Sequence, residues 1–282
     1  MYQEYFGFHQ RPFHLTPDTA LFLGLAPHFE ALKTVQAALQ MGEGLVKVVG
    51  EVGTGKTMVC RMLFGQLEGQ YQLVYLPNSA LSGQELRLAV ARELGISAQS
   101  DSVALVDEIQ QQLIRSCQQG LPVVILVDEA QALSDEALEV LRLFGNLETE
   151  QQKLLQIVLF GQPELDKRLA QHHLRQFRQR ITFSAKLRPL KLDESVAYID
   201  NRLQQSGGST SLFSLNQKRA LWRASQGIPR LINQICHKAL LLAMEAGKIK
   251  VSNAHLYEAI HDTFDSQKPK FKSPYLWGWS SQ

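Results

Sequence analysis

The feature that most constrains this chain is a glycine-rich segment, GEVGTGKT, at positions 50–57, directly after the strand-like run LVKVV. It matches the pattern G-x-x-x-x-G-K-[ST], in which glycines let the backbone curl so that consecutive N–H groups point at one phosphate. A helix beginning at the end of the segment would add favourable dipole potential for an anion. A strict match arises by chance in roughly 1% of chains of this length. The sequence therefore predicts a phosphate-binding loop between a strand and a helix.

Every residue of this loop, and the one after it, is a candidate for contact with a bound nucleotide. They are Gly50, Glu51, Val52, Gly53, Thr54, Gly55, Lys56, Thr57 and Met58. The ammonium of Lys56 would reach the β- and γ-phosphates, and the hydroxyl of Thr57 would ligate magnesium. We therefore expect ATP and Mg²⁺ as cofactors.

A second constellation is the run VVILV at 123–127 followed by Asp128 and Glu129. Five apolar residues indicate a strand buried on both faces, and the carboxyl ends of such strands are where ligands bind in open α/β sheets. Asp128 would hold magnesium through its water shell, and Glu129 would orient and polarise the water that attacks the γ-phosphate. Taken alone, the acidic pair could equally begin the next helix. With the loop upstream, the catalytic interpretation is favoured, and it predicts ATP hydrolysis.

The rest of the first 190 residues alternates between strand and helix patterns, which indicates a parallel sheet covered on both faces. Strands are predicted near 45–49, 73–76, 123–127, 155–160 and 181–187. Helices are predicted near 57–67, 84–94, 103–118, 134–147 and 164–169, with a capping box formed by Ser82 and Glu85. The expected fold is an α/β P-loop NTPase with a five-stranded parallel sheet between helices.

Strand patterns almost stop after Pro189. Four helices are predicted near 193–205, 217–226, 230–246 and 253–264, with a buried stripe in the third formed by Ile232, Ile235, Ala239 and Leu242. We therefore divide the chain into an α/β nucleotide-binding domain at 1–190, a small all-helical domain at 191–265 and a tail at 266–282. The first domain includes the Phe- and Pro-rich N-terminal segment.

Composition narrows the class of protein. The formal net charge of +2, from 29 Lys and Arg against 27 Asp and Glu, is too small to indicate nucleic-acid binding by bulk charge. Cys60, Cys117 and Cys236 show no metal-ligand spacing and are expected to be buried small hydrophobes in a reducing compartment. No signal peptide and no apolar run of about 20 residues is evident, so we expect a cytoplasmic chain without a transmembrane segment.

Several segments make a family resemblance specific over about residues 1–265. They are FGF and RPFHLTPD near the start, the phosphate loop, LVDEAQ, LFGQPEL, FRQRI and GIPRLIN. With them the chain resembles the AAA+ ATPases of the general secretion pathway protein A (ExeA/GspA) group, in particular its short members linked to biogenesis of the MSHA type IV pilus. The resemblance implies a helical lid domain and a homo-oligomer. It also implies a role as an assembly factor for a type IV (MSHA-like) pilus or a type II-like secretion system, with partners at the inner membrane and a position peripheral to it.

The same resemblance implies roles for four further residues. Gln162 would occupy the sensor-1 position and contact the γ-phosphate or the attacking water, although a glutamine in a G-Q-P turn needs no such role. Arg178 or Arg180 would project into a neighbouring subunit's ATP site as an arginine finger, and the choice between them stays open. Arg230 would be sensor 2, on the lid. It is placed in the first turn of a helix, where the dipole disfavours a cation and so suggests a compensating anion.

The segment 167–191 holds eight Lys or Arg and no acidic residue. Besides a finger, it could contact DNA phosphates or form an ordinary solvated face. The first of these gives the alternative function, a DNA-binding AAA+ ATPase of the transposition target-selector type. The near-neutral net charge and the lack of an evident helix-turn-helix disfavour that alternative.

Aromatic and histidine residues leave further alternatives. Phe6, Phe8 and Phe13 could line an adenine pocket or pack in a core. His172 and His173 lack a third ligand at metal spacing and are expected in a surface loop. Trp277 and Trp279, behind Lys268, Lys270 and Lys272, suit a membrane interface, a partner groove or a tail with no specific role.

Overall fold

The computed structural model describes residues 2–16, 19–77, 80–96, 102–148 and 153–270, so the tail tryptophans Trp277 and Trp279 and Lys272 lie outside the described residues. By its contacts the chain forms two compact units. An α/β unit comprises His28–Val52 and Lys56–Leu187, and a helical unit comprises Met1–Pro27, Gly53–Gly55 and the stretch that starts at Arg188.

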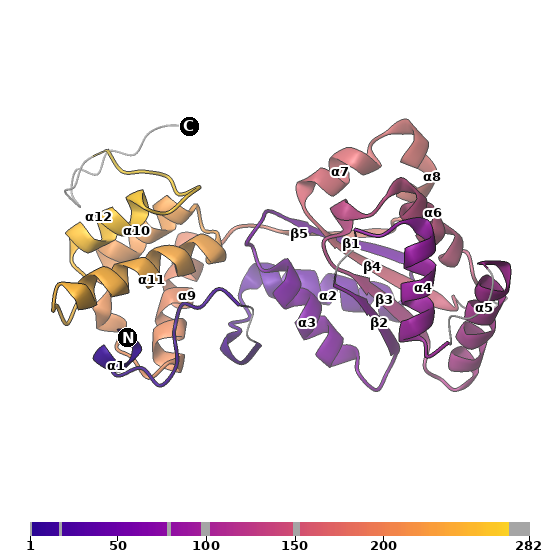
Figure 1. Ribbon diagram of the computed structural model, residues 1–282, viewed down its shortest axis with the longest axis horizontal. Helices are drawn as coiled ribbons and strands as arrows, with labels where there is room; N and C mark the ends of the chain where they lie inside the picture. Colours follow the sequence, from indigo (N-terminus) through magenta and orange to yellow (C-terminus); the bar gives the residue numbers. More distant parts are fainter. Residues whose placement is uncertain (1, 17–18, 78–79, 97–101, 149–152, 271–282) are drawn as a thin grey trace. The chain divides into compact units, whose positions relative to one another are not determined.

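The α/β unit contains one five-stranded parallel sheet (Figure 1). Its strands are β1 (Leu45–Gly50), β2 (Gln72–Leu76), β3 (Val123–Val127), β4 (Leu155–Gly161) and β5 (Phe183–Leu187). Their order across the sheet is β2-β3-β4-β1-β5, and every adjacent pair is parallel. The predicted five-stranded parallel sheet is therefore confirmed. Because β4 lies between β1 and β3, the segments that follow these three strands emerge side by side at the carboxyl edge.

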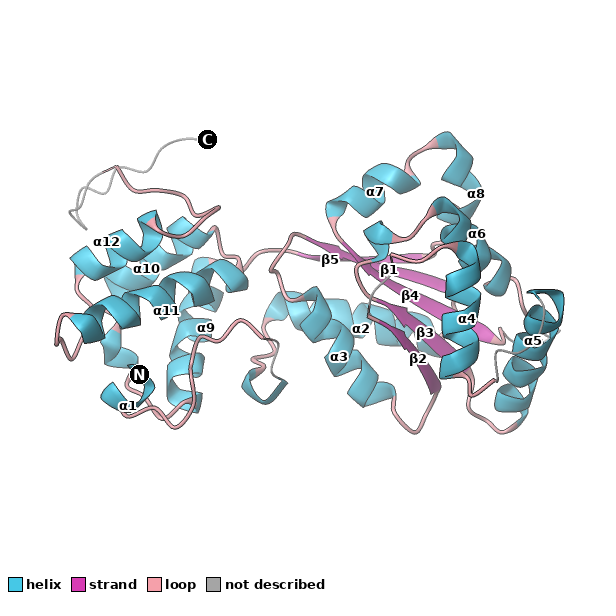
Figure 2. Cartoon of the chain, in the orientation of Figure 1, coloured by secondary structure: helices cyan, strands magenta, loops and turns pink. Residues whose placement is uncertain are grey.

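Helices cover both faces of this sheet (Figure 2). One face packs against α2 (Ala26–Gln40) and α3 (Lys56–Leu67). The other packs against α4 (Gly83–Glu93), α5 (Ser102–Gln118), α6 (Asp135–Phe144), α7 (Pro163–Leu169) and α8 (Arg175–Arg178). The central strands β3 and β4 are buried along their whole length. That burial explains why their sequences are almost continuously apolar.

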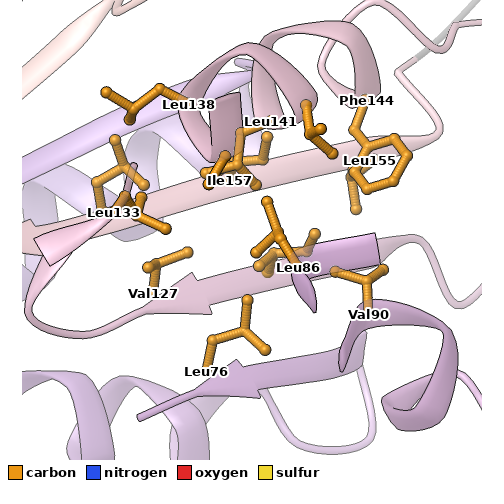
Figure 3. Packing of buried hydrophobic residues seen from close by; sticks show 14 of the residues in the cluster. Leu76, Leu86, Val90, Val127, Leu133, Leu138, Leu141, Phe144, Leu155 and Ile157 are labelled. Atoms are coloured by element: carbon orange, nitrogen blue, oxygen red, sulfur yellow. The ribbon is translucent and has the colours of Figure 1, made fainter. Parts of the chain in front are cut away.

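Alternation along the strands decides which residue faces which helix layer. Val46 and Val48 belong to the core on the α2/α3 side, whereas Leu45 and Val49 belong to the core on the other side. Figure 3 shows the second core: side chains of α4 and α6 meet those of the strands, including Leu86, Leu141 and Ile157. Burying apolar area on both faces at about 25 cal/mol per Å² supplies the main favourable contribution to the unit's stability.

Element boundaries differ from the sequence prediction at a few ends. β5 starts at Phe183 rather than at 181, because Ile181 still bonds the preceding turn through its N–H to the carbonyl of Arg178. Helix α6 ends at Phe144 rather than at 147, with Gly145 as its C-cap. The capping box of Ser82 and Glu85 at the start of α4 is confirmed.

The helical unit contains α9 (Leu192–Gln205), α10 (Leu215–Ser225), α11 (Pro229–Glu245) and α12 (Asn253–His261). These are the four helices predicted after Pro189. Of the predicted stripe in α11, Ile232, Ile235 and Ala239 are fully buried, and Leu242 is partly buried against the same core. None of the described helices, in either unit, is long and apolar enough to cross a membrane.

The N-terminal segment belongs to this helical unit by its contacts, not to the α/β unit with which we grouped it from the sequence. It contains the short helices α1 (Tyr2–Tyr5) and η1 (Thr19–Leu21). Phe8 and Phe13 are buried in the helical core, and Phe6 packs against it. Phe13 meets Phe213 edge to face at 6.3 Å between ring centroids. The aromatic residues thus account for the grouping, since their burial is a large apolar gain.

Candidate nucleotide-binding site

The phosphate loop joins the end of β1 to the start of α3. Gly50 is the last residue of the strand, and Lys56 is the first residue of the helix. Between them Gly53 and Gly55 have φ angles of +81° and +103°, a region that residues with a Cβ rarely adopt. These two glycines let the loop turn with its backbone close to a ligand, as the sequence pattern indicates.

Lys56 is buried, with 5% of its surface exposed. Its Nζ donates to the carbonyl oxygens of Gly50, at 2.8 Å, and Glu51, at 3.0 Å. Burial lowers the pKa of Lys56, while the carboxylates of Glu129 and Asp128 act against that shift. The ammonium therefore lies over the loop in the electrostatic field of both acids.

The other loop residues differ in exposure. Thr54 is buried, Thr57 and Met58 are half-buried, and Glu51 and Val52 are exposed. A phosphate loop binds phosphate through its backbone N–H groups, and every residue of this loop has one. Glu51 and Val52 can therefore contact a nucleotide through their backbone although their side chains are exposed.

Asp128 follows β3 directly and has only 3% of its surface exposed. Its carboxylate accepts a hydrogen bond from the side chain of Thr57, and its Oδ1 accepts one from the backbone N–H of Glu129 at 2.9 Å. Burial raises the pKa of Asp128, partly offset by these hydrogen bonds and by the charge of Lys56. The two residues predicted to hold magnesium are thus in direct contact.

The oxygen donors of Thr57 and Asp128 suit magnesium, which takes one or two protein oxygens and completes its shell with water and phosphate. Among the described residues no group of three or more His, Cys, Asp or Glu side chains could hold a metal ion on its own. The histidine pair is not part of such a group: His173 Nε2 lies 2.8 Å from Asp135 Oδ2.

Glu129 begins a 3-10 turn, η2 (Ala130–Ala132), with φ of +52°. Its Oε2 accepts hydrogen bonds from the side-chain amides of Gln162, at 2.9 Å, and Gln131, at 2.5 Å. Burial alone would raise the pKa of Glu129, but these two hydrogen bonds and the charge of Lys56 outweigh it, and the pKa lies below its ordinary value. The carboxylate is held ionised in one orientation, as a residue that accepts a proton from water must be.

Sequence reasoning missed Gln131, although it stands two positions after Glu129 within the quoted segment LVDEAQ. It also missed Arg168, whose Nη1 donates to the carbonyls of Gln131, at 2.8 Å, and Leu133, at 2.6 Å. The only available signal for Gln131 was its proximity to the acidic pair. No spacing rule connects Arg168 to this turn, because they meet through the fold.

The candidate arginines lie elsewhere. Arg178 ends α8 and Arg180 follows it, and both are exposed. They precede β5, so they lie at the amino edge of the sheet, whereas the phosphate loop lies at the carboxyl edge. The five residues of β5 span roughly 17 Å at about 3.3 Å per residue. Neither arginine is therefore brought to the phosphate loop of its own chain.

Arg230 is the second residue of α11, in its first turn as predicted, and its side chain is exposed. Within the helical unit its backbone N–H donates to the carbonyl of Gly53 at 3.2 Å. A Cβ on Gly53 would lie 2.6 Å from the Cβ of Arg230, so only glycine fits there. The contact of the Arg230 guanidinium with a phosphate stays a prediction.

The segment that contains most of the site residues matches a known protein family. Residues 39–169, which include the phosphate loop, Asp128, Glu129 and Gln162, match a family model described as an AAA domain. The fold is that of an AAA+ P-loop NTPase. Such a fold implies nucleotide binding, typically with Mg²⁺.

A relative aligns with the chain over most of its length. The chain is 40% identical over 264 residues, 93% of its length, to the general secretion pathway protein A of Aeromonas hydrophila. The chain spans about half the length of that relative, 48%.

Two solved structures share the fold at low identity. The ORC2 protein of Aeropyrum pernix, in ADPNP-ADP complexes, superposes with a TM-score of 0.67 at 15% identity, covering 92% of this chain and 72% of that one. The ORC1 protein of Aeropyrum pernix, in complex with DNA, gives 0.65 at 19% identity, covering 90% and 69%.

Proposed function

We propose that this AAA+ chain is a magnesium-dependent ATPase that acts as an assembly factor for a secretion or pilus apparatus. The observation that carries the catalytic part is the grouping of Lys56, Thr57, Asp128, Glu129 and Gln162 at one edge of the sheet, with Glu129 oriented by two amides. A nucleotide-binding module without turnover would not need the oriented carboxylate.

The proposed mechanism gives each residue of this group a role. Thr57 and Asp128 would hold magnesium, which would supply positive charge next to the phosphates. Lys56 leaves the carbonyls of Gly50 and Glu51 and donates to the phosphate oxygens. Glu129 orients and polarises the attacking water, and Gln162 holds Glu129 and contacts the water or the γ-phosphate. Arg230 contributes from α11 as sensor 2.

The arginine finger acts between subunits of a homo-oligomer. Arg178 and Arg180 are exposed at the edge of the sheet opposite the phosphate loop, so a phosphate contact would come from a neighbouring copy. A guanidinium suits that role because it is permanently charged and grips phosphate oxygens through two N–H groups. Both arginines remain candidates.

These roles predict a pattern of turnover. Multiple-turnover ATPase assays with Mg²⁺ should show that Lys56→Ala loses both ATP binding and hydrolysis. Glu129→Gln should keep ATP binding and lose at least 100-fold in kcat, on the order of what one positioned catalytic group contributes. Arg178→Ala and Arg180→Ala are compared in the same assay. The variant that loses turnover but still binds ATP identifies the arginine finger. Wild-type turnover in Glu129→Gln would remove the catalytic assignment.

The secretion role rests on the general secretion pathway protein A of Aeromonas hydrophila. We extend it to the MSHA-like pilus because the quoted sequence segments most resemble the pilus biogenesis protein MshM. The chain would then work in the cytoplasm at the inner membrane, on assembly proteins of that apparatus. Purification from the native host with bound partners tests this role, and recovery of replication or transposition proteins instead would contradict it.

The DNA-binding alternative is favoured by the solved structure of a protein of this fold with DNA. The basic segment 167–191 gives this alternative only weak support, because carboxylates pair with some of its cations. Arg168, Lys167 and Arg188 form ion pairs with Asp135, Glu164 and Glu194. Salt-dependent binding to duplex DNA with stimulated ATPase would favour this alternative over the assembly role.

A further inference from the structure

The turn that carries Glu129 is under conformational strain and is held by side chains outside the predicted site. A φ of +52° is unfavourable for a residue with a Cβ, at a cost of order 1–3 kcal/mol, and persists only when its surroundings enforce it. Two hydrogen bonds of the Glu129 backbone contribute: its N–H donates to the side-chain Oδ1 of Asp128 at 2.9 Å, and its carbonyl accepts from the Ala132 N–H at 2.9 Å. Neither of them fixes the carboxylate itself.

Gln131 connects this carboxylate to the neighbouring strand. Its Nε2 donates to Glu129 Oε2 at 2.5 Å, and its Oε1 accepts from the backbone N–H of Gln162 at 3.0 Å. Gln162 Nε2 donates to the same Oε2 at 2.9 Å. Glu129, Gln131 and Gln162 therefore form a closed set of hydrogen bonds between the ends of β3 and β4, and Gln131 supplies two of the three.

Arg168 in α7 fixes the turn on which Gln131 stands. Its guanidinium donates to the carbonyls of Gln131 and Leu133, and it forms an ion pair with Asp135. A cation on carbonyls at the end of a 3-10 turn is favourable both as a hydrogen-bond donor and through the local dipole. The Gln131 side chain is thus attached to a backbone that α7 holds in place.

We propose that Gln131, supported by Arg168, is a positioning residue for ATP hydrolysis: it holds Glu129 in the orientation required to polarise the attacking water. The proposal rests on the proposed role of Glu129. Gln131 acts through Glu129 rather than on nucleotide, so it affects the chemical step and leaves ATP binding unchanged.

Gln131→Met tests this, because methionine keeps the length of the side chain and removes both polar atoms. We expect kcat to fall about three- to tenfold, the equivalent of roughly one hydrogen bond, with KM and the ATP dissociation constant unchanged. Arg168→Met should lower kcat with the same pattern, and the two effects should combine to less than their product, since both act on one turn. Gln176→Met, at an exposed position of α8, is the matched control and should change nothing.

A double-mutant cycle of Gln131→Met with Glu129→Gln tests the role of Gln131 separately from the proposed role of Glu129. Gln131→Met should lower the single-turnover rate in the wild-type background and have no further effect in the Glu129→Gln background. An unchanged kcat, a loss of ATP binding, or equal losses in both backgrounds would overturn the role of Gln131. If Glu129→Gln itself turns over at the wild-type rate, it is the proposed function that fails, whatever Gln131→Met does.

Discussion

At the residue scale, the glycine that precedes Gln162 has no room for a side chain. Gly161 ends β4 immediately before Gln162, and a Cβ placed on it would lie 2.6 Å from Cδ2 and 3.1 Å from Cβ of Leu165. Leu165 is fully buried in the core, so a shift of its side chain would have to displace neighbouring core atoms. The backbone of β4 thus lies close to Leu165 of α7, directly before Gln162.

Gly161→Ala should therefore destabilise the protein by about 1–3 kcal/mol, the range for overpacking a core, and should also lower kcat by displacing Gln162. Gly65→Ala is the matched control. Gly65 lies within α3, a Cβ there would meet nothing within 4 Å, and alanine should be neutral or stabilising by up to about 1 kcal/mol. Denaturant unfolding of both variants measures the difference. Equal free energies of unfolding for the two would contradict the packing argument.

At the level of elements, the start of α9 depends on a carboxylate. Glu194 accepts two hydrogen bonds from Arg188, both at 2.8 Å, and one from the backbone N–H of Lys191 at 2.7 Å. The Arg188 hydrogen bonds are the largest cause of a pKa of Glu194 lowered to about 2. They connect the chain just after β5 to the first turn of α9.

A depressed carboxyl pKa contributes stability that is present above the unfolded value, about 4.5, and is lost as the pH falls toward about 2. Glu194→Gln should therefore lower the free energy of unfolding by about 2 kcal/mol at pH 6. The difference from wild type should shrink as the pH falls from 4.5 to 2. Glu245→Gln, at an exposed position of α11, removes the same formal charge and is the matched control. A Glu194→Gln difference that stays constant over this range would contradict the assignment.

Sequence patterns identified the elements well where the pattern was long and periodic. All five strands and the main helices after them were predicted, because doubly buried parallel strands and amphipathic helices leave strong apolar signals. The 3-10 turn η2 and the four-residue helix α8 were not, since elements this short carry no period. The position of residues 2–16 was also inaccessible. Phe8 and Phe13 are apolar enough for any core, and only the fold shows that they pack with the helical unit.

For the candidate site, too, residues in local motifs were predicted and residues brought together by the fold were missed. Lys56, Thr57, Asp128 and Glu129 were predicted from local motifs, and the structure places them in contact or within electrostatic range. Gln131 and Arg168 were missed because their roles depend on contacts between β3, β4 and α7 that no motif records. The sequence also left Arg178 and Arg180 unresolved. Both are exposed, so their exposure does not distinguish between them.

At the scale of the whole molecule, the account depends on bringing together segments that are far apart in the sequence. Gly50 ends β1, Lys56 begins α3 and Asp128 follows β3, all within the α/β unit. The proposed ATPase activity requires that one nucleotide with one metal engage the phosphate loop and Asp128 together.

The most direct test of that requirement is equilibrium binding of ATP, with and without Mg²⁺, to wild type, Lys56→Ala and Asp128→Asn. We predict tight binding to wild type that strengthens with Mg²⁺, a general loss in Lys56→Ala, and loss of only the magnesium-dependent part in Asp128→Asn. Undiminished Mg²⁺-dependent ATP binding in both variants would show that the glycine-rich loop and the acidic end of β3 do not form one site.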